Sequence, residues 1–148
     1  MTGALHAANG RFARGFNCAQ SIFSAFAGHF GVSSEFALRL AAPFGGGMAR
    51  EGEACGALTG ALMILGLQYA QDRPEDKDRI YGIAREFMAH FQQQHGAIRC
   101  SELLGHDIST PEGLQAARDE NVFASVCPSL INETAKALIR FLKEHPAP

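Results

Sequence analysis

Residues 54–70, ACGALTGALMILGLQYA, are the most apolar stretch of this chain and set the interpretation of the rest. Apolar side chains recur there at helical spacing, and further apolar residues fill the sides between them. A helix that is apolar on nearly every side belongs at the centre of a bundle. The stretch is just short of a membrane span and contains three glycines and a threonine. We therefore expect a buried central helix and no membrane span.

Small residues form a ridge along this central helix. Gly56 and Gly60 are four residues apart, as are Ala57 and Ala61, so each pair lies on one side of the helix. Such a ridge lets a neighbouring backbone come close. Tight packing inside the bundle explains it, and so does contact across a homodimer.

The segments on both sides of the central helix also have helical patterns. No stretch alternates apolar and polar residues as a half-buried strand does, and no Asn-Gly or Asp-Gly hairpin occurs. Capping residues, glycine stops and prolines mark the helix boundaries. We expect one all-α domain over residues 1–148, a helical bundle around the central helix. Besides the central helix, its helices are expected at 17–30 with Asn17 as cap, from Ser33 or Ser34 to before Pro43, at 74–95, at 101–105, from the cap Thr110 to 120, and from Pro128 to 145.

The composition excludes several classes of partner. The chain has 148 residues, of which 47% are hydrophobic and 19% charged, with a formal net charge of −2. Binding to nucleic acid or to an anionic membrane requires a concentrated basic face, which this near-neutral sequence lacks. The N-terminus has no basic head followed by a long apolar run, so we expect a cytoplasmic location and reduced cysteines.

The four cysteines are expected at the beginnings of helices. Cys18 follows the cap Asn17, Cys55 begins the central helix, Cys100 precedes SELLG, and Cys127 precedes Pro128. Free N–H groups and the helix dipole favour a thiolate at such positions, and hence lower the thiol pKa. The same preference suits a redox thiol and a metal ligand. No C-x-x-C motif occurs, which argues against a thioredoxin-like site, a zinc finger and a ferredoxin.

Other residues are candidates beside the cysteines. Gly45, Gly46 and Gly47 could present backbone N–H groups to an anion or a cofactor phosphate, although a turn that brings Cys55 close to another helix explains them better. Arg50 and Arg99 are near cysteines in the sequence and could lower their pKa values. The six histidines are treated mostly as surface or helix-end residues. We single out His106 as a proton donor or extra ligand.

Several motifs combine into a recognisable pattern: FNCAQS at 16–21, FGGGMAREGE at 44–53, CGALTG at 55–60, CSELLG at 100–105 and CPSLI at 127–131. On these motifs, across roughly residues 12 to 142, the chain resembles the C_GCAxxG_C_C family of redox-active proteins, which carries a C-G-A-x-x-G motif. The resemblance implies a small helical protein that is redox active through its four cysteines. Family members are often encoded near oxidoreductase or transporter genes. The resemblance assigns no reaction.

Three hypotheses follow. In the first, this is a thiol redox protein in which Cys18, Cys55, Cys100 and Cys127 exchange dithiol and disulfide states, with Cys55 as the best candidate nucleophile. Its redox partner would be a protein or a small oxidant or reductant, and its activity that of a thiol–disulfide oxidoreductase. In the second, the same four thiolates hold an iron–sulfur cluster or a soft metal ion. In the third, this is a helical interaction domain with inert cysteines.

Overall fold

The computed structural model describes the backbone of residues 1–148 and every side chain except that of Thr2. Over these residues the chain forms eight α-helices and three short 3₁₀ turns, with no strand beyond one isolated bridge between Ala54 and Arg99. The all-helical fold expected from the sequence is thus confirmed. The α-helices are α1 (Thr2–Ala13), α2 (Cys18–Ala27), α3 (Ser34–Ala41), α4 (Gly56–Tyr69), α5 (Lys77–His95), α6 (Cys100–Leu104), α7 (Pro111–Asp119) and α8 (Val122–Glu144).

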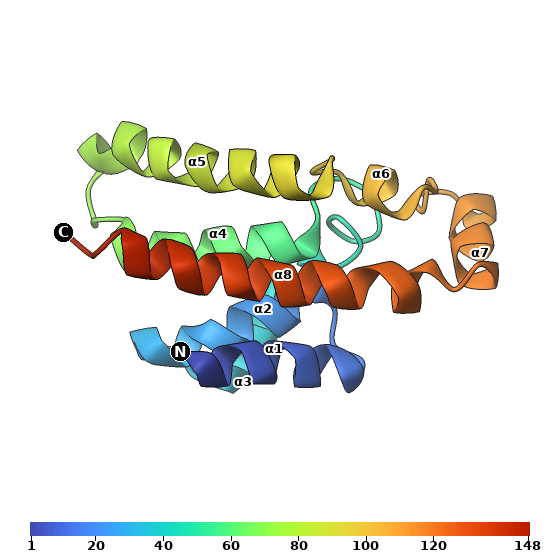
Figure 1. Cartoon of the computed structure of the whole chain (residues 1–148), viewed down its shortest axis with the longest axis horizontal. Helices are drawn as coiled ribbons and strands as arrows, with labels where there is room; N and C mark the ends of the chain where they lie inside the picture. The colour runs from blue at the N-terminus through green and yellow to red at the C-terminus, as the bar shows by residue number, and fades with distance from the viewer.

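The apolar stretch forms α4, which lies at the centre of the bundle. It packs against α2, α5 and α8, and Figure 1 shows α4 and α8 between α5 on one side and α1 to α3 on the other. Leu58, Ala61 and Ile64 are fully buried, whereas Leu67 is 41% exposed. The expected burial is therefore confirmed along most of α4. None of the described helices combines the length and apolarity that a bilayer crossing requires.

The small-residue ridge of α4 faces α2. A Cβ atom added to Gly60 would lie 3.0 Å from the carbonyl oxygen of Ala19 and 3.1 Å from the Cβ of Ile22. Only a residue without a side chain lets the two helices approach this closely. Packing inside the bundle thus accounts for the ridge, and a homodimer stays a prediction.

Local signals fixed most helix boundaries as expected. Asn17 caps α2 through a capping box with Gln20, and Ser33 and Thr110 cap α3 and α7. Gly96 ends α5 in the left-handed conformation. These features depend on only a few neighbouring residues, which is why the sequence reveals them.

Two helices differ from the expectation. Helix α1 was not expected, and α8 begins at Val122, so Pro128 lies inside it and does not open it. A proline inside a helix removes one hydrogen bond. Val122, Phe123 and Val126 pack against a small second core, and their burial offsets this loss. The prediction for the start of the last helix was wrong because this burial is not visible in the sequence pattern.

Candidate functional site

The structure brings the four cysteines to one cavity of about 550 Å³. Cys18 is the first residue of α2, Cys55 is the N-cap of α4, Cys100 is the first residue of α6, and Cys127 lies in the second turn of α8. All four are free thiols. The cavity is at the end of the bundle where α6 begins, which Figure 1 shows opposite the two chain termini. Four segments distant in sequence thus share one site.

The capping residues of α2 hold Cys18 in place. Asn17 accepts a hydrogen bond from the Gln20 amide at 2.9 Å, and its own side-chain amide donates to the Ala42 carbonyl at 2.9 Å. The Gln20 side chain donates to the Leu38 carbonyl at 2.9 Å. The first turn of α2 is therefore tied to α3 and to the turn after it, and Cys18 with it.

Gly56 lets Cys18 approach the start of α4. A Cβ atom added to Gly56 would lie 3.1 Å from the Cβ of Cys18 and 3.0 Å from the backbone nitrogen of Ala19. Because Gly56 directly follows Cys55, this close approach places the first two cysteines beside the same cavity. The glycine of the CGALTG motif therefore has a steric role at the site.

An antiparallel bridge between Ala54 and Arg99 holds the backbone at Cys55 next to the backbone at Cys100. The Cys55 amide donates to the Ile98 carbonyl at 2.9 Å, and the Cys100 amide donates to the Glu53 carbonyl at 2.6 Å. These bonds bring together segments separated by all of α4 and α5. The start of α6 is thereby fixed against the start of α4.

The glycine-rich loop before α4 contains five consecutive residues with positive φ, the left-handed backbone conformation. Gly46 and Gly47 have φ of 64° and 68°, and Met48, Ala49 and Arg50 follow with φ of 67°, 50° and 62°. Positive φ is uncommon in residues that carry a Cβ atom. A Cβ atom on Gly47 would lie 2.8 Å from the Cβ of Cys100. The interpretation of these glycines as a tight turn is supported, because the loop packs directly on a cysteine.

The glycines of this loop differ in their access to the cavity. Gly45 and Gly46 line it, whereas Gly47 packs against Glu53 and Cys100. Binding of a cofactor by these three glycines stays a prediction.

Burial dominates the ionisation of two cysteines. It raises the pKa of Cys55 to about 11 and that of Cys100 to about 12. The backbone N–H groups of Ala57 and Leu58 lower the pKa of Cys55, as expected at a helix start, but they form no cap hydrogen bond of normal geometry and burial outweighs them. The general expectation of lowered thiol pKa values at helix starts was therefore wrong for these residues.

A hydrogen bond joins the side chains of Cys18 and Cys127. This bond, followed by burial, raises the pKa of Cys18 well above its ordinary value. The same bond lowers the pKa of Cys127. Cys18 is thus the donor, and Cys127 is the sulfur that becomes a thiolate first. The lowered pKa of Cys127 has its source in this partner, since Cys127 lies within α8 and not at a helix start as the sequence had suggested.

The other candidate groups are placed differently. Arg50 lines the cavity, whereas Arg99 is half-exposed and lies 3.6 Å from Glu53. His106 pairs with Glu120 at 2.8 Å and is not among the described residues that line the cavity.

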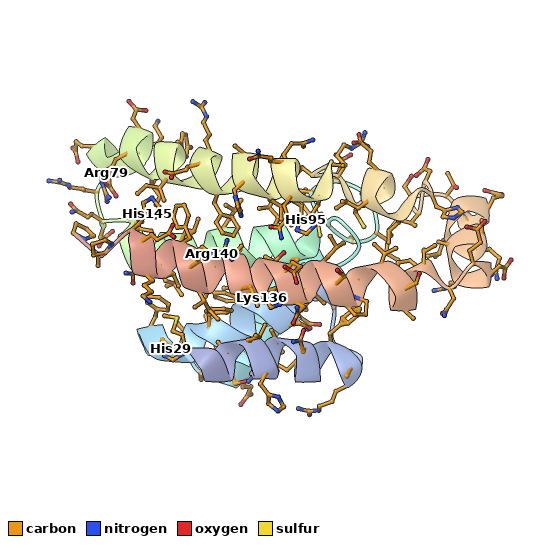
Figure 2. The ribbon with its side chains drawn as sticks, viewed as in Figure 1. His29, Arg79, His95, Lys136, Arg140 and His145 are labelled. Atoms are coloured by element: carbon orange, nitrogen blue, oxygen red, sulfur yellow. The ribbon has the colours of Figure 1, made fainter. Side chains whose placement is uncertain are left out.

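Three histidines lie at helix ends, as expected. His29 is in the 3₁₀ turn after α2, His95 ends α5, and His145 follows α8. Figure 2 shows His29 and His145 at the end of the molecule opposite α6 and α7, and His95 between α5 and α8. None of them lines the cysteine cavity as the structure describes it.

Sequence analysis missed the aromatic lining of the cavity. Phe12 from α1, Phe16 from the following loop, and Phe123 from α8 all line it. A signal was present, because Phe16 is two residues before Cys18, and Phe123 is one helical turn before Cys127. The absence of α1 from the expected fold concealed the contribution of Phe12.

Four thiols are suitable ligands for an iron–sulfur cluster or a soft metal ion. As arranged here, however, the described side chains include no group of three or more Cys, His, Asp or Glu that could hold a metal ion. The donor chemistry fits such a centre, whereas the side chains as arranged do not form such a ligand group.

Comparisons with known proteins support the assignment to a family. A family model described as "Putative redox-active protein (C_GCAxxG_C_C)" matches residues 16–141, which include all four cysteines. Neither the curated proteins nor the solved structures gave a match. Because the family model covers most of the chain and contains the whole cysteine site, the chain belongs to the C_GCAxxG_C_C family.

Proposed function

We propose that this is a thiol redox protein in which Cys18 and Cys127 cycle between a dithiol and a disulfide. The observation that carries the proposal is that Cys18 and Cys127 line one cavity and share a hydrogen bond, which raises the pKa of Cys18 and lowers that of Cys127. A thiolate is the attacking form in thiol–disulfide exchange, and a neighbouring thiol is needed to resolve the intermediate. The pair provides both. Membership of a family described as redox-active agrees with this role.

The reaction with an oxidised disulfide substrate proceeds in two steps. The Cys127 thiolate attacks one sulfur of the substrate, forms a mixed disulfide and releases the other sulfur as a thiolate, which takes a proton. Cys18 then loses its proton and attacks the Cys127 sulfur, which releases the second substrate thiol. Two electrons pass from the protein to the substrate, and a Cys18–Cys127 disulfide remains. An external thiol reverses these steps.

Cys55 and Cys100 have a different role in this proposal. Their raised pKa values keep both thiols protonated near neutral pH, so neither is suited to the first attack. This favours Cys127 over Cys55 as the nucleophile. Negative charge on Cys127 raises the pKa of both residues, so Cys55 and Cys100 interact electrostatically with the Cys18–Cys127 pair. Once the Cys18–Cys127 disulfide has formed, Cys55 and Cys100 would become oxidised in its place by thiol–disulfide exchange.

Oxidation with diamide tests the proposal. The fully reduced protein is treated anaerobically with increasing amounts of diamide, alkylated, and mapped by peptide mass spectrometry without reduction. We expect a Cys18–Cys127 linkage to form first. The Cys18→Ser and Cys127→Ser variants should lose this linkage, whereas the matched Cys55→Ser and Cys100→Ser variants should keep it.

Two results would contradict the proposal. If all four serine variants behave as the parent protein does, the cysteines are packing residues of an interaction domain. If protein purified anaerobically contains stoichiometric iron and acid-labile sulfide, and loses both in any of the four variants, the thiols are cluster ligands. The cytoplasmic location expected from the N-terminal sequence stays a prediction in either case.

A further inference from the structure

The cysteine cavity limits what kind of molecule can reach the thiols. Cys55 is 2% exposed, Cys127 is 5% exposed and Cys100 is 8% exposed, whereas Cys18 is partly buried. Disulfide exchange requires the attacking sulfur to contact the substrate sulfur. Cys127, the attacking residue of the proposed pair, is thus buried away from the surface of a folded partner protein. A molecule that enters the cavity reaches all four cysteines, which favours a small molecule over a partner protein as the redox partner.

The walls of the cavity indicate the chemistry of this molecule. They are largely apolar and include the rings of Phe12, Phe16 and Phe123. Aromatic rings in such a wall favour a flat aromatic ligand through stacked or edge-to-face contacts. A volume of about 550 Å³ accommodates a molecule of several fused rings and is far larger than a metal ion needs.

Arg50 adds one charge to this apolar cavity. It is the single charged residue among the described residues that line the cavity, and it is exposed to solvent, so it lies at the rim. Among the described side chains, Arg50 has no carboxylate within ion-pair distance, in contrast to the nearby Arg99. Its guanidinium is therefore available to bind an anionic group on a ligand whose rings lie deeper.

We propose that the cavity binds a flat aromatic two-electron acceptor of the quinone or flavin class, with one anionic group held by Arg50. This inference rests on the proposed thiol function and names its redox partner. In the reaction, the Cys127 sulfur bonds to a ring carbon of the acceptor. Cys18 then attacks that sulfur, and the carbon–sulfur bond breaks with its electron pair left on the ring. The two protons of the dithiol pass to the reduced acceptor, and a Cys18–Cys127 disulfide forms.

Binding is measured separately from reaction. Isothermal titration calorimetry under anaerobic conditions uses the full-length Cys127→Ser variant, reduced beforehand and freed of reductant, which cannot complete the reaction, with oxidised anthraquinone-2-sulfonate and with oxidised flavin mononucleotide. We expect at least one of them to bind with a micromolar dissociation constant, and the better ligand distinguishes the quinone from the flavin class. The neutral 2-(hydroxymethyl)anthraquinone is the matched ligand without an anionic group.

Two further substitutions locate the binding site. Arg50→Gln, introduced into the Cys127→Ser variant, should weaken binding of the anionic ligand by about tenfold. It should change binding of the neutral ligand by less than about twofold. The control Arg85→Gln, an exposed arginine on α5, should change neither. Leu103→Trp should abolish binding of both anthraquinones by filling the cavity, with folding checked by circular dichroism.

The inference is overturned if neither ligand binds up to millimolar concentration, or if Arg50→Gln and Leu103→Trp both leave binding unchanged. This result is distinguishable from failure of the thiol mechanism. If the thiol mechanism fails and the inference holds, the ligand binds as expected, but diamide produces no Cys18–Cys127 linkage in the parent protein.

Discussion

The close packing of α2 on α4 can be tested with two glycine substitutions in the same helix. Gly60 and Gly66 both lie inside α4, so replacing either with alanine improves helix propensity by about 0.5 to 1 kcal/mol. Their surroundings differ. An added Cβ at Gly60 lies 3.0 Å from the Ala19 carbonyl oxygen, whereas one at Gly66 has no atom outside its own helix within 4 Å.

The propensity gain cancels when the two variants are compared, and the difference between them reports the packing alone. The contacting atom is the backbone carbonyl oxygen of Ala19, a fully buried residue of α2, and this atom cannot move without displacing the helix. Overpacking of this kind costs about 1 to 3 kcal/mol. We therefore expect Gly66→Ala to be more stable than the parent protein, and Gly60→Ala to be less stable than Gly66→Ala by about 2 kcal/mol.

The assay is urea unfolding followed by circular dichroism with dithiothreitol present, so that no disulfide contributes. A difference of 2 kcal/mol corresponds to a shift of about 1 M in the urea midpoint at an m-value of about 2 kcal/mol/M. Equal stabilisation by the two substitutions would refute the close contact between α2 and α4. It would also remove the steric reason for the position of Cys18, since Cys18 adjoins Ala19.

Three other predictions concern the cysteines and Pro128. Replacing Cys18 with alanine should raise the pKa of Cys127, measured by thiolate absorbance near 240 nm as a function of pH, because the hydrogen bond that lowers it is lost; an unchanged titration would show that the bond is not the cause. The free energy of unfolding should fall as pH rises from about 9 to 11, since burial raises the pKa of folded Cys55 above that of the unfolded thiol. Cys55→Ala should lose part of this alkaline decline in urea titrations, and an identical decline would contradict the reasoning. Pro128→Ala should stabilise α8 by up to about 2 kcal/mol by restoring a helix hydrogen bond. It should also alter the titration of the adjacent Cys127. A variant less stable than the parent protein would show that the proline is not strained in this helix.

The sequence alone determined the helical class of the protein and most of its helix boundaries. Asn17, Ser33, Thr110 and Gly96 act on backbone groups within a few residues, so their effect is visible in the local sequence. The apolar character of residues 54–70 was likewise sufficient to place α4 at the centre. The four cysteines were also selected from the sequence, and they do share one cavity.

Tertiary structure decided what those cysteines can do. A thiol pKa depends on burial and on groups that come from distant parts of the chain, and neither is encoded at the cysteine itself. Cys18 and Cys127 meet only because α2 and α8 pack together, and burial reverses the effect of the helix start at Cys55. The position of Pro128 inside α8 has the same origin, because a core contact, which is non-local, outweighs a local helix signal.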